Sequence, residues 1–290
     1  MEWTMQYEDF EAIRVNIREG VAYVTIDNAP VNVEDARLVA DLSRFARVVQ
    51  SDEGVRVIVF QSANPEFFAA HADNNWMFDP AGLMALADPE ADPALNPLQQ
   101  LHERLRNLPQ ITIAKLRGRL RAGGAEFAMT ADMRFAAAGE TWLSQPESLM
   151  GIFPGGGGTQ YLNRLVGRAR GLEIALSGEL YDSATAERYG WINREIPGQY
   201  LDVWVDSIAR RIALLPKGVA AAAKEAFDAA EASGPVPDLA EEARAHAKVY
   251  PSPQAVVDRV EVLMSHGGQQ RVAELNLEES LRSIPWPSAE

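Results

Sequence analysis

The chain has 290 residues, 47% of them hydrophobic, and a formal net charge of −14. This length can bury one large core with an appendage, and the acidic balance argues against nucleic acid as a partner, because phosphate binding needs a basic surface. The absence of cysteine excludes disulfides, thiolate catalysis and cysteine-ligated metals.

The sequence also shows no sign of a membrane or export segment. No window is long and apolar enough to cross a bilayer, and the acidic stretch 1–10 lacks the apolar core of a secretory signal. We therefore expect a cytoplasmic protein without a membrane partner.

The first elements form a strand, helix, strand unit. Residues 21–26 and 55–60 are β-branched, apolar runs typical of buried strands, and residues 34–50 carry apolar side chains at helical spacing. This order implies a right-handed crossover with parallel pairing of the two strands.

A loop rich in aromatic and small residues follows at 64–76. From the residues alone it is an ordinary connection in which Phe67 and Phe68 fill the core, and its single His71 is more often a structural residue than a catalytic one. Residues 78–97 contain several prolines and are too long for a simple connector. They form either a lid or pocket wall, or a surface insertion.

The run 111–116 has the composition of a buried strand, and Gly123 and Gly124 then open a helical segment. Backbone N–H groups at a helix start favour negative charge, so this turn can hold an anion within reach of Glu126. The alternative is a tight turn followed by a solvated glutamate.

Basic residues alternate along the strand that leads into this turn, which places them on one face. That face pairs with a neighbouring subunit, is solvated, or attracts a phosphate. The residues are Lys115, Arg117, Arg119 and Arg121.

A second glycine-rich stretch lies at 144–160. It contains a carboxylate after a proline, in Gln145-Pro146-Glu147, and then Pro154 and four glycines before a helix. A plain core has little reason to keep so costly a local sequence. The alternative for Glu147 is a turn residue.

Three segments together resemble the crotonase superfamily, whose type member is enoyl-CoA hydratase. They are Ala-Gly-Gly-Ala-Glu at 122–126, Gln-Pro-Glu at 145–147 and Gly-Ile-Phe-Pro-Gly-Gly-Gly-Gly-Thr-Gln at 151–160. The resemblance runs from about residue 20 to residue 196. It implies an α/β fold, a crotonase-like spiral of repeated ββα turns, followed by a helical C-terminal trimerisation region.

By this resemblance, the backbone N–H groups of Ala72 and Gly123 form an oxyanion hole, a pair of donors that stabilises charge on a substrate oxygen. Glu126 and Glu147 are the catalytic base and acid. The resemblance implies no metal and no cofactor, with coenzyme A as part of the substrate. Residues expected to contact the substrate are His71, Ala70, Asp73, Gly124, Trp142 and Gly155, where Trp142 has the alternative of a core residue.

The chain departs from the family pattern at a few positions. His71 stands where the family normally has glycine, and Asn74-Asn75 replace an apolar residue and a frequent lysine that contacts the coenzyme A phosphates. Arg117 stands where asparagine is common. If His71 lines the pocket, it contacts the thioester or narrows the choice of substrate.

The resemblance implies addition of water to the double bond of a 2-enoyl-CoA, giving a 3-hydroxyacyl-CoA. Relatives that only isomerise a double bond usually keep one acid/base carboxylate, whereas this chain has two, and two converging carboxylates favour an acid and base pair. The alternatives are another enolate reaction, such as isomerisation or carbon–carbon bond hydrolysis, or an acyl-thioester-binding or protein-interaction role without turnover.

The chain divides after Pro197 into a core with the active site, 1–197, and a helical C-terminal region, 198–290. The resemblance implies a homotrimer or dimer of trimers. The sequence leaves open whether the last helices cover the active site. Helices are expected at 201–214, 217–232, 238–249, 254–265 and 270–284.

Overall fold

The structure is a computed structural model that describes residues 7–215, 218–232, 247 and 254–285. The predicted helix at 238–249 falls almost entirely outside these residues. Among the described helices, none is long and apolar enough to span a lipid bilayer.

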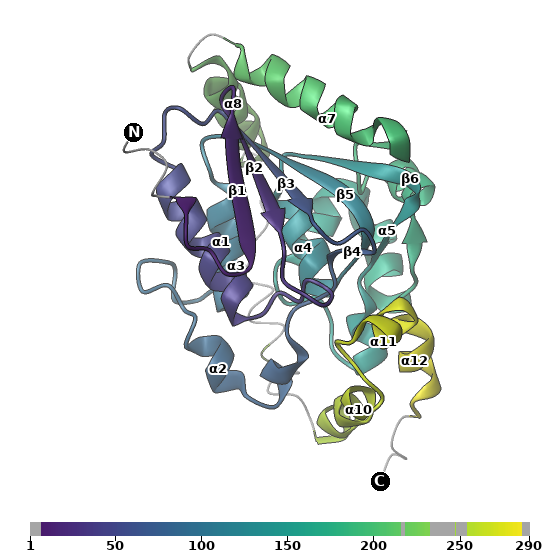
Figure 1. The fold of residues 1–290 in the computed structure, drawn as a ribbon. Coiled ribbons are helices and arrows are strands. Elements are labelled where there is room, and N and C mark those ends of the chain that lie inside the picture. Colours follow the sequence, from purple (N-terminus) through teal and green to yellow (C-terminus); the bar gives the residue numbers. More distant parts are fainter. Residues whose placement is uncertain (1–6, 216–217, 233–246, 248–253, 286–290) are drawn as a thin grey trace.

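A mixed sheet forms the centre of the molecule (Figure 1). Its order is β1-β2-β3-β5-β6-β7, with β4 paired to β5 and β8 paired to β6. Neighbours from β2 to β6 run parallel, while the outer strands β1 and β7 are antiparallel to their neighbours. The strands are β1 (Ile13–Arg18), β2 (Val21–Ile26), β3 (Val57–Ser62), β4 (Phe67–Ala69), β5 (Ile111–Arg121), β6 (Met133–Ser144), β7 (Tyr181–Asp182) and β8 (Arg194–Pro197).

Helices cover both faces of this sheet. The main core lies between the sheet and α1, α3, α4 and α5, and a second apolar cluster joins the other face to α7. The larger helices are α1 (Ala36–Val49), α3 (Pro97–Arg106), α4 (Ala122–Thr130), α5 (Gly158–Ser177), α7 (Gly198–Ala213), α8 (Val219–Ala232) and α10 (Gln254–Ser265). The shorter ones are η2 (Asn74–Met77), α2 (Pro80–Met84), η3 (Pro146–Met150), α6 (Ser183–Tyr189), α11 (Arg271–Leu275) and α12 (Leu277–Ser283).

The first predicted unit is confirmed: β2 and β3 pair in parallel on either side of α1. The helix is shorter than predicted, because the Asp35 side chain accepts the N–H groups of Arg37 and Leu38 and so caps it. Glu34, which the pattern placed in the helix, instead forms a parallel bridge with Ala72. This bridge ties the start of the chain to the loop after β4.

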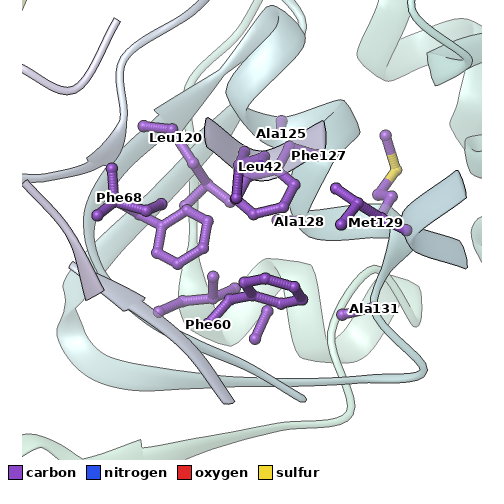
Figure 2. Packing of buried hydrophobic residues seen from close by; sticks show 14 of the residues in the cluster. Leu42, Phe60, Phe68, Leu120, Ala125, Phe127, Ala128, Met129 and Ala131 are labelled. Carbon is purple, nitrogen blue, oxygen red and sulfur yellow. The ribbon is translucent and has the colours of Figure 1, made fainter. Parts of the chain in front are cut away.

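Aromatic rings fill the main core behind α4 (Figure 2). Phe127 packs edge-to-face on Phe60 with ring centroids 5.2 Å apart, and it stacks on Phe68 at 5.7 Å. The predicted core role of Phe67 and Phe68 is confirmed, since both are 0% exposed. These contacts fix the helix that carries Glu126.

Strand β5 serves two parts of the sheet because it bends at Gly118. Its first residues pair with β3, and its last residues pair with β4. Gly118 has φ +69°, and an added Cβ atom would lie 2.1 Å from the carbonyl carbon of Glu66. The bend directs the end of β5, and therefore the start of α4, toward the loop after β4.

The helices of the C-terminal region lie in two places: α7 packs on the sheet, and α10 to α12 lie together below β4 in Figure 1. Helix α7 follows the predicted division at Pro197 directly and packs on the sheet. Helix α10 spans the predicted range, whereas the helix predicted at 270–284 is broken into α11 and α12, because Asn276 has non-helical dihedrals.

Candidate active site

One cavity of about 230 Å³ lies where α4, the loop after β4, η3 and the C-terminal helices meet. Its wall is mostly apolar and includes Met77, Leu83 and Met84, so the segment around α2 forms a pocket wall, one of the two predicted alternatives. Helices α10 and α12 add Leu263, Leu277 and Leu281. The C-terminal helices thus cover the cavity of their own chain.

The carboxylate of Glu126 is buried in the wall of this cavity, with 2% of the residue exposed. Its Oε1 accepts the N–H groups of Gly156, at 2.9 Å, and Gly158, at 2.8 Å. Gly158 is the first residue of α5, so the carboxylate also sits at the positive end of a helix dipole. These donors stabilise its ionised form.

The glycine run lets the backbone approach this carboxylate. A Cβ atom on Gly156 would lie 2.4 Å from Glu126 Oε2, and one on Gly158 would lie 2.7 Å from Oε1. Gly157 has φ +117°. Any side chain at these positions would therefore displace the carboxylate or strain the loop.

Glu147 reaches the same cavity from a different segment, η3, and is 5% exposed. With the Gln145 amide turned so that its nitrogen faces the carboxylate, that nitrogen donates to Oε1 at 2.7 Å and to Oε2 at 3.1 Å. The Gln-Pro-Glu motif therefore contains both a buried carboxylate and a neighbour that orients it.

The amides of Ala72 and Gly123 come from segments far apart in sequence and meet at the cavity wall. A Cβ atom on Gly123 would lie only 3.0 Å from the Ala72 nitrogen, which shows how closely the two segments approach. The bridge to Glu34 uses the carbonyl of His71 and the amide of Asp73. The Ala72 and Gly123 amides have no hydrogen-bond partner among the described residues.

His71 lines the cavity, but both of its ring nitrogens are bound within the protein. Nε2 lies 2.9 Å from Glu274 Oε1, and Nδ1 lies 2.8 Å from the Ala72 carbonyl oxygen. Burial alone lowers the pKa of His71, yet the facing Glu274 carboxylate outweighs this effect and raises the pKa. The contacts of both ring nitrogens hold His71, and with it the loop, in place.

A second buried pair, Glu34 and His102, lies behind Glu126. His102 Nε2 is 3.0 Å from Glu34 Oε1, and Nδ1 is 2.6 Å from the carbonyl oxygen of Gly156. Burial lowers the pKa of His102, but Glu34, and to a smaller extent Glu126, raise it to about 9. Because Gly156 also donates its N–H to Glu126, this pair holds the segment that binds the Glu126 carboxylate.

Comparison with known proteins identifies the chain at this point. The family model described as Enoyl-CoA hydratase/isomerase matches residues 16–263, which is most of the chain. The chain belongs to the enoyl-CoA hydratase/isomerase family, within the crotonase superfamily.

Several relatives of this enoyl-CoA hydratase/isomerase family member have solved structures. The crystal structure of a candidate enoyl-CoA hydratase from Streptomyces avermitilis is 44% identical, with a TM-score of 0.86, and the match covers 95% of this chain and 99% of that one. A structure of Pseudomonas aeruginosa DspI is 26% identical, with a TM-score of 0.69, over 79% of this chain and 91% of that one. The spiral α/β fold expected for the family is thereby confirmed.

Curated relatives match over shorter stretches. A protein named "Probable enoyl-CoA hydratase" from Bacillus subtilis is 36% identical over 168 residues, which is 58% of this chain and 62% of the relative. A "Fatty acid oxidation complex subunit alpha" from Aliivibrio fischeri is 31% identical over 183 residues, 62% of this chain but only 26% of the relative. The chain therefore spans less than two thirds of the length of these relatives.

Most of the family-based site residues line the one cavity. Besides the two carboxylates and the two amide residues, these are His71, Asp73 and Gly155.

Three expected substrate contacts do not line the cavity. Ala70 is 0% exposed within an apolar cluster beside Val31 and Phe67. Gly124 packs on the backbone of Ala69, where an added Cβ atom would lie 2.2 Å from the carbonyl oxygen. Trp142 lies on β6 with the guanidinium of Arg119 over its ring, 4.9 Å from the centroid. We therefore assign no substrate contact to these three residues.

Three of the four basic residues that alternate along β5 pair with acidic side chains of their own chain. Lys115 Nζ lies 2.6 Å from Asp202, and Arg117 lies 2.7 Å from Glu140. Arg121 is fully buried against Glu278. Glu34 and Glu278 carry no motif in the sequence, so sequence reasoning missed both. Among the described residues, no three His, Asp or Glu side chains gather into a metal site.

Proposed function

We propose that this enoyl-CoA hydratase/isomerase family member adds water to the double bond of a 2-enoyl-CoA and gives a 3-hydroxyacyl-CoA. Nucleophilic attack at the β-carbon moves charge onto the thioester oxygen. The amides of Ala72 and Gly123 hydrogen-bond that oxygen, and they do so without reorganisation because they belong to fixed backbone.

The two carboxylates divide the proton transfers. Glu126 takes a proton from the attacking water, and Glu147 delivers a proton to the α-carbon. The two N–H donors on Glu126 favour its ionised, basic form. At Glu147 the neighbour turned toward the carboxylate is the uncharged side-chain amide of Gln145.

One observation supports this proposal above the others: two buried carboxylates from separate segments line the same small, mostly apolar cavity as two amides that have no hydrogen-bond partner in the part of the chain that the structure describes. A single-carboxylate isomerase does not need the second acid. The apolar wall suits an acyl chain, and its solvent exclusion strengthens the electrostatic effect of the amides. The substrate class and the reaction are both part of the proposal.

The test is the Glu147→Gln variant. We expect it to lower kcat for hydration of a short 2-enoyl-CoA by about 10²–10⁴-fold, the usual contribution of a positioned general acid. The loss of absorbance of the conjugated thioester measures the rate. Isothermal titration with coenzyme A measures whether binding persists.

The matched control is Glu140→Gln, the same change on the strand that leads to η3. Glu140 is exposed and pairs with Arg117, so its replacement leaves turnover unchanged. Hydration by Glu147→Gln at the wild-type rate would refute the assignment of the acid. A wild type that binds coenzyme A and never turns over the enoyl thioester would favour a binding role.

A further inference from the structure

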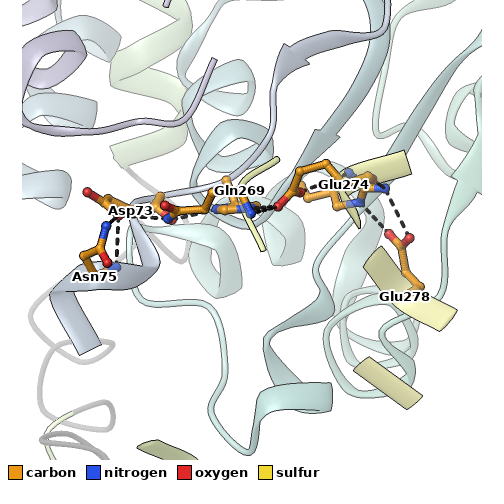
Figure 3. A network of polar contacts seen from close by, with 8 residues as sticks. Asp73, Asn75, Gln269, Glu274 and Glu278 are labelled. Atoms are coloured by element: carbon orange, nitrogen blue, oxygen red, sulfur yellow. Dashed lines mark hydrogen bonds and ion pairs between the residues drawn. The ribbon is translucent and has the colours of Figure 1, made fainter. Parts of the chain in front are cut away.

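The segment from Gln269 to Glu278, at the start of the last helices, contacts both chain segments that carry the Ala72 and Gly123 amides (Figure 3). These contacts are polar and largely buried. They join residues that lie 153 to 203 positions apart in the sequence.

At the first amide, Ala72 is held from both sides. The residue before it, His71, bonds Glu274 Oε1 at 2.9 Å. The residue after it, Asp73, accepts the side-chain amide of Gln269 at 2.8 Å. Gln269 also donates its backbone N–H to Glu274 Oε1, at 2.7 Å, so these contacts form one network. The C-terminal segment therefore holds the side chains on either side of the Ala72 amide, while the backbone of Glu34 holds the peptide itself through the His71 carbonyl.

At the second amide, Arg121 takes the corresponding place. Its Nε donates to Glu278 Oε1 at 2.6 Å, and one terminal nitrogen donates to Glu278 Oε2 at 3.2 Å and to the Glu274 carbonyl oxygen at 2.8 Å. Between Arg121 and Gly123, Ala122 has a φ of 45°, which a residue with a side chain seldom adopts. Such a turn persists only where its surroundings fix it.

Burying these charged side chains costs desolvation free energy, and apolar side chains would fill the same space without that cost. Arg121 and Glu274 are 0% exposed, His71 is 4% and Glu278 is 6%. Breaking a buried ion pair is strongly destabilising, whereas apolar side chains of similar volume often pack as well or better. What charged pairs provide instead is one defined geometry, through hydrogen bonds with fixed directions.

The protonation of His71 fits this role. Both ring nitrogens face acceptors, the Ala72 carbonyl and the Glu274 carboxylate, so only the imidazolium form donates to both. The two cations, His71 and Arg121, and the two anions, Glu274 and Glu278, then balance in the buried network. No uncompensated charge is left beside the cavity by these four groups.

We propose that the segment from Gln269 to Glu278 is a positioning element of the active site, which aims the two oxyanion amides through the His71–Glu274 and Arg121–Glu278 pairs. This inference rests on the proposed oxyanion hole, and it assigns to the last helices a role beyond covering the cavity. His71 and Arg121 act through the neighbouring peptides and do not touch the substrate.

The test uses Glu274→Gln and Glu278→Gln in the full chain, with two readouts. The first is the absorbance of a bound aryl-conjugated enoyl-CoA, which moves to longer wavelength when its carbonyl oxygen is hydrogen-bonded. We expect each variant to lose most of the wild-type shift while it still binds the thioester. The second is turnover, for which we expect kcat to fall about 10–100-fold with a smaller change in KM, because a misplaced group costs rate more than binding.

Arg282→Gln is the matched control. The change breaks the ion pair between Arg282 and Glu179, whose nitrogen and oxygen lie 3.0 Å apart and which also joins the C-terminal region to the core. Unlike the buried pairs, these two side chains are exposed, at 43% and 61%. We expect this variant to keep the absorbance shift and kcat. If Glu278→Gln fails to fold, Glu278→Asp keeps the charge and shortens the side chain, and we expect a partial loss of the shift.

The outcomes separate this inference from the proposed reaction. A wild type that shifts the bound thioester but does not hydrate it would refute the reaction and leave the positioning test intact. Folded Glu274→Gln and Glu278→Gln variants with the full wild-type shift would overturn the positioning role. So would a wild type that produces no shift on binding.

Discussion

Two buried histidines, His71 and His102, share one arrangement at opposite sides of the site. In each, both ring nitrogens face an acceptor, one a backbone carbonyl and the other a glutamate. A neutral imidazole can donate through only one nitrogen, so both rings need the extra proton. Each histidine thereby becomes a charged link between two chain segments. His71 holds the loop that carries an amide, and His102 holds the glycine segment that binds Glu126.

The pair of His102 and Glu34 gives a pH prediction. Because the folded-state pKa of His102 is raised from 6.5 to about 9, its stabilising contribution is complete below pH 6.5 and is lost as the pH rises through 9. Across that window the free energy of unfolding contributed by the pair falls by about 3 kcal/mol, the equivalent of the pKa difference. The charged groups that face the ring are Glu34 and Glu126.

Denaturant unfolding of the wild type and His102→Gln from pH 6 to pH 10 measures this contribution. Titration of groups that do not face His102 affects both proteins alike and cancels in the difference. We expect the stability difference between them to shrink as the pH rises. Two curves that run parallel over the whole range would show that His102 is not charged in the folded protein.

At the scale of elements, strand β5 places the site by bending in the middle. Its first half pairs with β3 and its last residues pair with β4, so the turn into α4 emerges beside the loop after β4. The bend depends on Gly118, whose backbone conformation is left-handed and whose α-carbon faces the backbone of Glu66. A bent strand therefore brings the second amide to the first.

We predict that Gly118→Ala lowers the free energy of unfolding by more than about 4 kcal/mol, because the new methyl group meets backbone that cannot move aside. Gly139→Ala is the matched control: Gly139 has a similar φ of +71°, but no atom lies within 4 Å of the added Cβ position. That change costs only the left-handed strain, about 1–2 kcal/mol. Equal losses for the two variants in denaturant unfolding would show that the clash at Glu66 is unimportant.

Local patterns predicted much of this element structure. The β2, α1, β3 unit and its parallel pairing follow from apolar periodicity, and the two glutamates and the glycine run follow from three short motifs between residues 122 and 160. The predicted helix begins two residues before α1, because Glu34 looks helical in sequence and its bridge to Ala72 is a tertiary contact. Tertiary contacts of this kind override the helix propensity of a single residue.

At the scale of the whole molecule, the least predictable part is the attachment of the last helices. His71 and Glu274 are 203 residues apart, and Arg121 and Glu278 are 157 apart, so no local pattern connects them. The same holds for His102 and Glu34, which are 68 residues apart. The departure of His71 from the family pattern was visible in the sequence. Its partner was not, and that partner identifies the histidine as a positioning residue.

The wall of the cavity is built from four parts of the chain: α4, η3, the loop after β4 and the C-terminal helices. A site assembled from four separate parts of the chain needs each part to be held in place. In this molecule buried ion pairs join the loop after β4 and the turn into α4 to the C-terminal helices, and the bend of β5 also directs that turn. The glycine segment holds Glu126 itself.

The most direct measurement is turnover of a short 2-enoyl-CoA by the wild-type protein in ¹⁸O-labelled water, followed by mass spectrometry of the acyl-CoA product. If Glu126 and Glu147 add water across the double bond while the Ala72 and Gly123 amides hold the thioester oxygen, the product is a 3-hydroxyacyl-CoA that carries the label on its hydroxyl group. An unlabelled double-bond isomer, a released free acid or unchanged substrate would contradict hydration.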